Sequence, residues 1–304
     1  MGTGSQAITG LNAGTAYFLY PFWDESSSTV KFVSSASLVN PATIIPGAQF
    51  ENLTGALGYV NTTTNLTRPT ACSFEMWFLG TLSANYNLGC FDSLQTGQPG
   101  TEDFTILISA GSISWTPGTS GIRNSIKYND GSWHHILGTY DGTTAFLYVD
   151  GIQTGTAAVT ALASFTGWWR ISQADFAGGN FVTIGRAAVY PTALTGTQAA
   201  SHFTTMKNSG LATYDALVAA DGASYYWKLN ETVGTTAADS IGVNTGTYNG
   251  TFTLNQTKAL LSSVGSPAYC WLAANIQAQQ TQALQGHAPL SAGTMATATP
   301  ASGT

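Results

Sequence analysis

The side chains that could carry chemistry in this chain are few and scattered. His134 and His135 form its one pair of adjacent histidines. Neighbouring residues on a strand point to opposite faces of a sheet, so these two cannot chelate one metal ion without a bulge. We expect one of them to be interior and the other exposed. No nucleophile elbow and no glycine-rich phosphate loop is present, so the sequence predicts neither nucleophilic nor phosphate chemistry.

Calcium is the one cofactor that the acidic residues leave open. Its preferred oxygen ligands are supplied by loops, and five aspartates stand in or near predicted loops: Asp92, Asp103, Asp141, Asp150 and Asp175. The simpler interpretation is that Asp141 and Asp150 only build turns. Because no Asp-x-Asp cluster occurs, we assign no metal site and predict no cofactor.

The cysteines do not indicate zinc either. Cys72, Cys90 and Cys270 lack the C-x-x-C spacing of a zinc site. We favour three buried free thiols, because disulfide-built domains contain more cysteines. The alternative is that Cys72 and Cys90 meet across neighbouring strands.

Aromatic side chains offer a different chemistry, since their flat faces can stack on sugar rings. The candidates for such a platform are Trp115, Tyr128, Trp168 and Trp169. Trp168 and Trp169 are neighbours, so on an extended chain at least one is expected to face away from the core. Packing in the core is the alternative, and it is the favoured interpretation for Trp133.

Composition excludes several classes of function. Only 8% of the 304 residues are charged and the net charge is −6, with no cluster of Lys and Arg. Nucleic-acid binding depends on such clusters, and so does attraction to anionic membranes, so we predict neither. No apolar run approaches the ~20 residues of a membrane helix, and we predict no membrane insertion.

The elements that must position these residues are mostly strands. Alternating polar and apolar residues predict strands at 17–20, 30–33, 73–79, 104–109, 112–115 and 181–190. Between 130 and 156, three Asp-Gly pairs separate strands at 133–140, 145–149 and 152–156, which predicts an antiparallel meander. Short helices are expected at 196–206, with Thr195 as N-cap, and at 271–284, before a flexible tail at 291–304.

From Asp130 the sequence resembles a known family. The runs Asp-Gly-Ser-Trp-His-His (130–135), Gly-Thr-Tyr-Asp-Gly (138–142) and Leu-Tyr-Val-Asp-Gly (147–151) are similar to laminin-G-like domains of the concanavalin A-like lectin/glucanase superfamily. Similar early and closing strands extend the resemblance over residues 45–206. It implies an all-β fold, an antiparallel jelly-roll sandwich. We assign this sandwich to residues 41–262, with a small β piece at 1–40 and a helix and tail at 263–304.

One family element is displaced. A strand that usually opens the domain resembles residues 225–231, so the late segment 224–256 comes last instead of first. Circular permutation within one chain is the favoured explanation. The alternative is donation of this strand to another copy, which would link chains into an assembly.

The flanks resemble other modules. Residues 8–17 are similar to the end of a fibronectin type III domain. Together with residues 20–25, 265–268 and 284–291 they resemble bacteriophage tail-tip and tail-fibre proteins. This resemblance implies a virion or extracellular location, contact with other virion proteins, and a homo-oligomer.

Glucanases of the superfamily carry Glu-x-Asp-x-x-Glu on one strand, which aligns their carboxylates. No such cluster occurs here. We expect Glu75, Glu102, Asp103 and Asp239 to be isolated surface or turn acids. The sequence therefore predicts a non-enzymatic adhesion protein, a phage tail or fibre component that binds host-surface glycan. The first alternative is a self-assembling structural protein without a ligand, and a glycosidase is a remote one.

Overall fold

The computed structural model describes residues 18–24, 29–35, 43–53, 56–81, 85–97, 99–173 and 180–260. The chain divides into two compact units, Ala42–Ser262 and a second that joins Met1–Pro41 to Ser263–Thr304. In the second unit, β1 (Phe18–Asp24) and β2 (Thr29–Ser35) form an antiparallel hairpin where two strands were predicted. The predicted helix at 271–284, the tail, residues 8–17, Cys270 and Asp175 lie outside the described residues.

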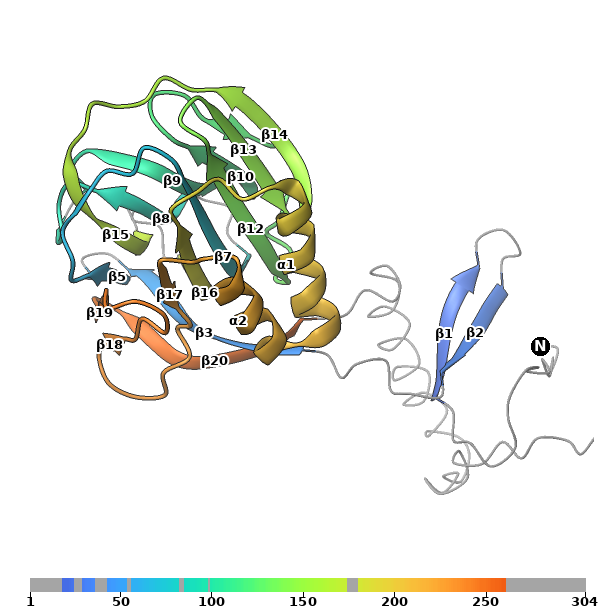
Figure 1. Ribbon diagram of the computed structural model, residues 1–304. Helices are drawn as coiled ribbons and strands as arrows, with labels where there is room; N and C mark the ends of the chain where they lie inside the picture. Colours follow the sequence, from blue (N-terminus) through green and yellow to red (C-terminus); the bar gives the residue numbers. More distant parts are fainter. Residues whose placement is uncertain are drawn as a thin grey trace, which may run out of the picture. The chain divides into compact units, whose positions relative to one another are not determined.

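The larger unit is a sandwich of two antiparallel sheets (Figure 1). Sheet I has the order β11-β10-β9-β8-β15-β5-β19-β18, with β6 beside β15. Its strands are β5 (Tyr59–Thr62), β6 (Leu66–Thr67), β8 (Tyr86–Asp92), β9 (Glu102–Ser109), β10 (Ser112–Thr116), β11 (Ile122–Arg123), β15 (Thr166–Gln173), β18 (Thr236–Ala237) and β19 (Gly246–Asn249).

Sheet II has the order β14-β13-β12-β7-β16-β3-β20, with β17 beside β16 and β4 beside β3. Its strands are β3 (Thr43–Leu53), β4 (Ala56–Leu57), β7 (Cys72–Gly80), β12 (Trp133–Tyr140), β13 (Thr144–Val149), β14 (Ile152–Ala158), β16 (Asn180–Tyr190), β17 (Tyr225–Trp227) and β20 (Phe252–Leu260). The predicted jelly-roll class of fold is confirmed.

Sheet II is buried on both faces, and the alternation of β7 shows how. Phe74, Met76 and Phe78 belong to the core between the sheets, as their spacing predicts. Trp77 points the other way and joins a second core beneath two helices. Burial of large apolar side chains on both faces therefore fixes the register of this strand, since a one-residue slip would exchange the two sets.

Two helices cover the outer face of sheet II (Figure 1). Helix α1 (Gly196–Ser209) begins where predicted, and Thr195 forms a capping box with Gln198. Helix α2 (Leu211–Ala220) was not predicted. Its sequence, LATYDALVAA, is apolar nearly all round, so it lacks the amphipathic period that marks a surface helix.

The Asp-Gly turns follow the prediction only in part. Asp150 and Gly151 both have positive φ, as the favoured hairpin turn requires. At the other two pairs only Gly131 and Gly142 have positive φ. The expectation of three such turns is therefore wrong in detail, although β12, β13 and β14 do form an antiparallel meander.

The late segment pairs with strands of the same chain. β17 lies beside β16, β19 beside β5, and β20 beside β3. In this single chain the strand that resembles the family's opening strand therefore completes its own sandwich.

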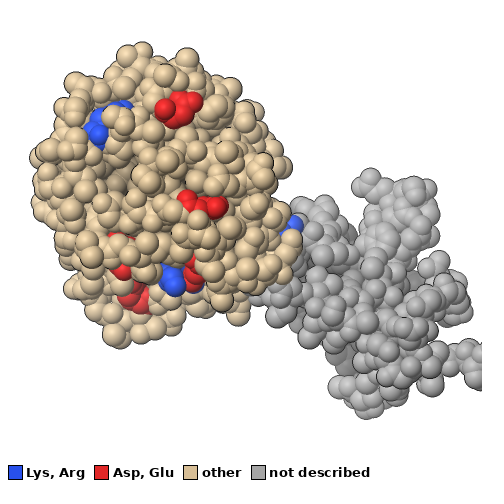
Figure 2. Space-filling view, in the orientation of Figure 1, with Lys and Arg blue, Asp and Glu red and all other residues tan. Residues whose placement is uncertain are grey.

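Charge is sparse on the surface as well as in the composition. Figure 2 shows one face on which Lys, Arg, Asp and Glu are few and separated. Several charges lie inside instead: Arg68 pairs with Asp103, and Arg170 pairs with Asp92 at 2.9 Å. Among the described residues, no helix has the length and apolar character needed to cross a membrane.

Candidate functional site

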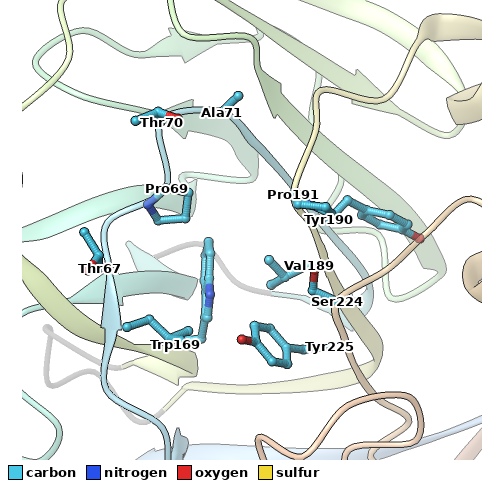
Figure 3. Close-up of a pocket in the computed structure, with 11 residues that line it drawn as sticks. Thr67, Pro69, Thr70, Ala71, Trp169, Val189, Tyr190, Pro191, Ser224 and Tyr225 are labelled. Atoms are coloured by element: carbon cyan, nitrogen blue, oxygen red, sulfur yellow. The ribbon is translucent and has the colours of Figure 1, made fainter.

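A pocket opens at one end of the sandwich, where the two sheets meet. We call it the Trp169 pocket (Figure 3). Its volume is about 290 Å³. Its lining residues come from β6 and the lead-in to β7, from β15, from the end of β16 and from the start of β17: Leu66, Thr67, Pro69, Thr70, Ala71, Trp169, Val189, Tyr190, Pro191, Ser224 and Tyr225.

The pocket is uncharged and lined with hydroxyl groups. No Asp, Glu, Lys, Arg or His lines it. Thr67 and Thr70 are exposed, and Ser224 and Tyr225 are partly exposed, so the pocket presents four hydroxyl-bearing side chains to solvent. Each hydroxyl can donate one hydrogen bond and accept others. The pocket therefore suits a neutral ligand that is itself rich in hydroxyl groups.

Trp169 lines this pocket from beneath its surface. Its side chain is fully buried and packs against the rings of Phe74, Phe91 and Phe104. The indole Nε1–H has no hydrogen-bond partner in the described structure. It also has no surface open to solvent, so a ligand acceptor could reach it only if the neighbouring side chains moved.

The four aromatic side chains predicted as a platform do not lie together. Trp168 and Trp169 face opposite sides of β15, as the alternation predicts, and only Trp168 is partly exposed. Trp115 is buried against Gly138 and donates to the carbonyl of Thr139. Tyr128 is 7% exposed and packs edge-on against His134. Of the four, only Trp169 lines the pocket; Tyr225, Ser224 and the threonines were missed, because nothing in their local sequence marks an open end of the sandwich.

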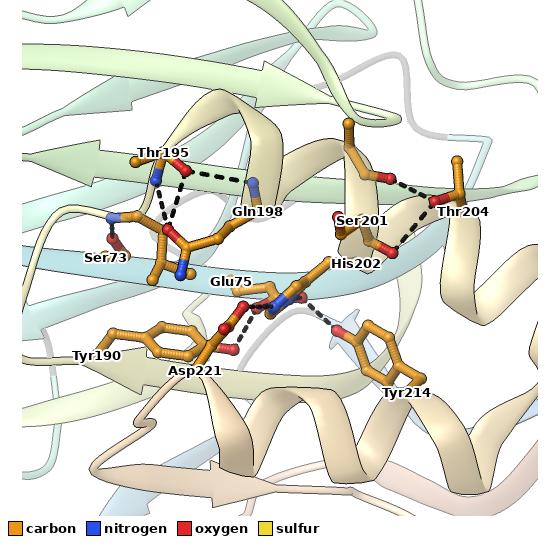
Figure 4. A network of polar contacts seen from close by, with 12 residues as sticks. Ser73, Glu75, Tyr190, Thr195, Gln198, Ser201, His202, Thr204, Tyr214 and Asp221 are labelled. Carbon is orange, nitrogen blue, oxygen red and sulfur yellow. Dashed lines mark hydrogen bonds and ion pairs between the residues drawn. The ribbon is translucent and has the colours of Figure 1, made fainter.

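A second polar region lies beneath the helices on the other face of sheet II. We call it the Glu75 network: Glu75, His135, Tyr190, His202, Tyr214 and Asp221 (Figure 4). Glu75 accepts hydrogen bonds from His135 Nε2 and His202 Nδ1, both at 2.8 Å. It also accepts from the hydroxyls of Tyr190, at 2.6 Å, and Tyr214. His202 Nε2 contacts Asp221 at 2.9 Å.

This network corrects the sequence prediction for Glu75. Glu75 is not a surface or turn acid, since its side chain is fully buried. His135 is interior and His134 partly exposed, as expected for adjacent strand residues. The partners come from strands and helices up to 139 residues away, so no local pattern could reveal them.

Glu75 and His202 stabilise each other's charged forms, although both side chains are buried. Burial alone would raise the pKa of Glu75, but the His202 charge and hydrogen bonds from His135 and His202 keep that pKa well below its usual range. Burial would lower the pKa of His202, yet Glu75 and then Asp221 raise it to about 9. The centre of the network is therefore an imidazolium between two carboxylates at neutral pH.

Glu75, His135 and His202 also have the ligand types of a zinc site. However, the oxygen–nitrogen distances of 2.8 Å are those of N–H···O hydrogen bonds. Two ligand atoms on a tetrahedral zinc ion, with bonds of about 2.0–2.1 Å, would lie about 3.3 Å apart. The hydroxyls of Tyr190 and Tyr214 donate to the same carboxylate, so its contacts are those of a hydrogen-bonded group. The other ring nitrogen of His135, Nδ1, is buried without a partner among the described residues.

The other acids that the sequence singled out have assigned partners. Asp103 and Asp92 are buried against Arg68 and Arg170, so the expectation that Asp103 is a surface or turn acid is wrong. Asp141 builds its turn by accepting the amides of Thr143 and Thr144. Cys72 and Cys90 are buried thiols that are not joined in a disulfide, as predicted, and Cys90 Sγ lies 3.5 Å from Glu102 Oε1.

The larger unit is a sandwich of two antiparallel sheets, consistent with a concanavalin A-like jelly roll. Comparison with known families agrees. Residues 54–200 match the model of the concanavalin A-like lectin/glucanases superfamily.

Solved structures with a similar fold share little sequence with the chain. A Bacteroides ovatus protein, provisionally described as carbohydrate binding, is 17% identical, with 82% of this chain and 72% of that chain covered and a TM-score of 0.49. A heptameric pentraxin from Limulus polyphemus is 11% identical, with 52% and 82% covered and a TM-score of 0.40. No curated protein matches the chain.

Proposed function

We propose that the larger unit is a non-enzymatic recognition module, and that the Trp169 pocket binds a neutral sugar residue. The observation that carries this proposal is the combination of four hydroxyl-bearing side chains that face solvent around an uncharged hollow. Sugars present hydroxyls that both donate and accept, and Tyr225 offers a partly exposed ring beside them.

The size of the pocket favours one sugar residue. Its volume of about 290 Å³ lies at the small end of ligand pockets. A volume of this size can hold one sugar residue. The superfamily of residues 54–200 includes lectins by its description, which agrees with this interpretation.

A virion or extracellular surface, and a phage tail or fibre in particular, is the setting that we propose for this module. Support comes from the resemblance of the flanking sequences to tail modules and from a surface that relies on hydroxyls and amides instead of ions. Virion proteins and further copies of the chain are the proposed partners in that setting.

The alternatives have less support. The hypothesis of a self-assembling protein assumed that the late segment 224–256 is donated to another copy. In this chain, β17 and β19 of that segment pair with strands of the same chain. Glycoside hydrolysis needs a pair of available carboxylates, whereas Glu75, Asp92 and Asp103 are each buried against basic partners.

A glycan array probed with the full chain tests the proposal, with calcium and again with EDTA. We expect saturable binding to neutral glycans, competition by free sugar, no effect of EDTA, and loss of signal in Tyr225→Ala. Binding that depends on calcium, or that is unchanged in Tyr225→Ala, would place recognition elsewhere. Failure of folded protein to bind any glycan would favour the structural role.

A further inference from the structure

The Trp169 pocket and the Glu75 network share a structural boundary, the end of β16. Tyr190 lines the pocket, and its hydroxyl points away from it to donate to Glu75 at 2.6 Å (Figures 3 and 4). A β-bulge between Gly185 and Ala188 makes this possible. It re-aims the strand so that Val189 faces the interior and Tyr190 faces the helices.

Helix α2 also connects the Glu75 network to the Trp169 pocket. Tyr214 on α2 donates to Glu75, and Asp221 at its end contacts His202. Three residues further on, Ser224 forms part of the pocket wall and donates its backbone N–H to the carbonyl of Val189 at 2.8 Å. Tyr225 pairs with Val189 in the short ladder between β17 and β16. The wall segment 224–225 thus follows directly from residues that the network holds.

The opposite wall of the pocket, residues 69–71, is connected through the chain of β7 to the Glu75 carboxylate. Glu75 lies on β7, four residues after Ala71, and residues 69–71 line the other side of the pocket. One buried carboxylate therefore connects both walls, through the chain of β7 on one side and through Tyr190, Tyr214 and His202 on the other.

We propose that Glu75, Tyr190 and His202 are positioning residues for the Trp169 pocket. The hydrogen bonds that join them lie outside the pocket and hold the wall segment 224–225 in its binding geometry. This inference rests on the proposed function only for the ligand, since the positioning itself is a property of the free protein. A three-residue strand, β17, has few ladder hydrogen bonds of its own, so its place depends on the helix that precedes it.

The proposal has a pH consequence. His202 faces Glu75 on β7 and Asp221 after α2, and Glu75 in turn faces His135 on β12, Tyr190 on β16 and Tyr214 on α2. Tyr226 on β17 contacts Asp215, which also pairs with Arg186 and Lys228. Loss of the His202 proton removes the one cation between Glu75 and Asp221. The wall should therefore loosen as pH rises through about 9, the pKa of His202, and stay closed toward acid.

Tyr190→Phe tests the positioning with a minimal change, because it removes only the hydroxyl and keeps the ring. Tyr140→Phe is a matched control. It deletes another buried tyrosine hydroxyl, which donates to the carbonyl of Gly142 at 2.7 Å and takes no part in the hydrogen bonds of the Glu75 network. Hydrogen exchange of the amides at 224–227 in the free full chain is the first readout. We expect exchange to rise about tenfold in Tyr190→Phe and to stay unchanged in Tyr140→Phe. Equal exchange in the two variants would overturn the proposal.

Binding separates this inference from the proposed function. The probes are methyl glycosides of glucose, galactose, mannose and N-acetylglucosamine, titrated from pH 6 to 10. We expect affinity to fall severalfold in Tyr190→Phe and to decline above about pH 9 in the wild type, with a flat profile in His202→Gln. If no glycoside binds the wild type, the proposed function fails, and the exchange experiment still decides the positioning. If a glycoside binds with a flat wild-type profile, the role assigned to His202 is wrong.

Discussion

The Trp169 pocket and the Glu75 network lie on either side of the end of β16, yet their polar groups differ in what they contact. In the network a buried carboxylate accepts hydrogen bonds from four side chains. In the pocket four hydroxyl-bearing side chains are exposed or partly exposed. Hydroxyls that face solvent in a hollow are available to a ligand, whereas the carboxylate of the network is already engaged.

The comparison also shows that a perturbed pKa is a poor guide to function here. The groups with the largest shifts belong to the network, where helices α1 and α2 dock on sheet II. Structural ion pairs shift pKa values as active sites do. No Asp, Glu, Lys, Arg or His lines the pocket, which agrees with recognition of a neutral ligand.

The largest effect is expected for Glu75→Gln. Removing this carboxylate leaves the buried His202 cation with one partner fewer. Breaking a buried ion pair costs about 3–5 kcal/mol, so the free energy of unfolding in denaturant should fall by that order. Asp141→Asn, at an exposed turn that Asn can also build, should cost less than about 0.5 kcal/mol. Similar losses in both variants would contradict the view that the network stabilises the helices.

The next effect is the pH dependence of stability. The pKa of His202 is raised in the folded state to about 9 from 6.5. The folded protein therefore holds a proton that the unfolded chain loses between these values. This contribution, of about 3 kcal/mol, is complete below pH 6.5 and is lost as pH rises through 9. Urea titrations from pH 6 to 10 should show this decline in the wild type and a flatter curve in His202→Gln; parallel curves would refute it.

A smaller effect is expected in the pocket for Tyr225→Ala. Loss of the aromatic face should weaken binding of a neutral methyl glycoside by up to about tenfold, as measured by calorimetry. Trp168→Ala is the control, since Trp168 is also partly exposed but lies on the outer face of sheet I. If Trp168→Ala abolishes binding and Tyr225→Ala does not, sugar recognition belongs to that outer face.

The smallest effect is expected for Thr67→Val, which keeps the shape of the side chain and removes one hydroxyl. Loss of a single neutral hydrogen bond is worth about 0.5–1.5 kcal/mol, so affinity should fall about twofold to tenfold. Thr236→Val changes an exposed threonine on β18, outside the pocket, and should have no effect. Equal affinities for the two variants would remove Thr67 from the site.

The sequence predicts the sandwich well because its information is local. Alternation in β7, the Asp150-Gly151 turn and the Thr195 cap each act within a few residues. Helix α2 was missed because its sequence is apolar nearly all round and so has no amphipathic period, although only Tyr214 and Val218 are buried.

The site was predicted less well because it depends on distant contacts. Glu75 is an isolated acid by sequence, and only the fold brings Tyr190, His202 and Tyr214 to it. Trp169 was among the predicted aromatics, but its place in the lining of a pocket depends on where the two sheets meet. Low overall charge also hides the fact that several of the charges are interior.

The most direct test of the central claim follows the indole N–H of Trp169 by NMR. The full chain has eight tryptophans, and the signal of Trp169 can be assigned by Trp169→Phe. Titration with the four neutral methyl glycosides should shift this signal saturably with at least one of them, while sialic acid and glucuronic acid glycosides leave it unchanged. A saturable shift confined to Trp168, or no shift of Trp169 with any glycoside, would contradict binding in the Trp169 pocket.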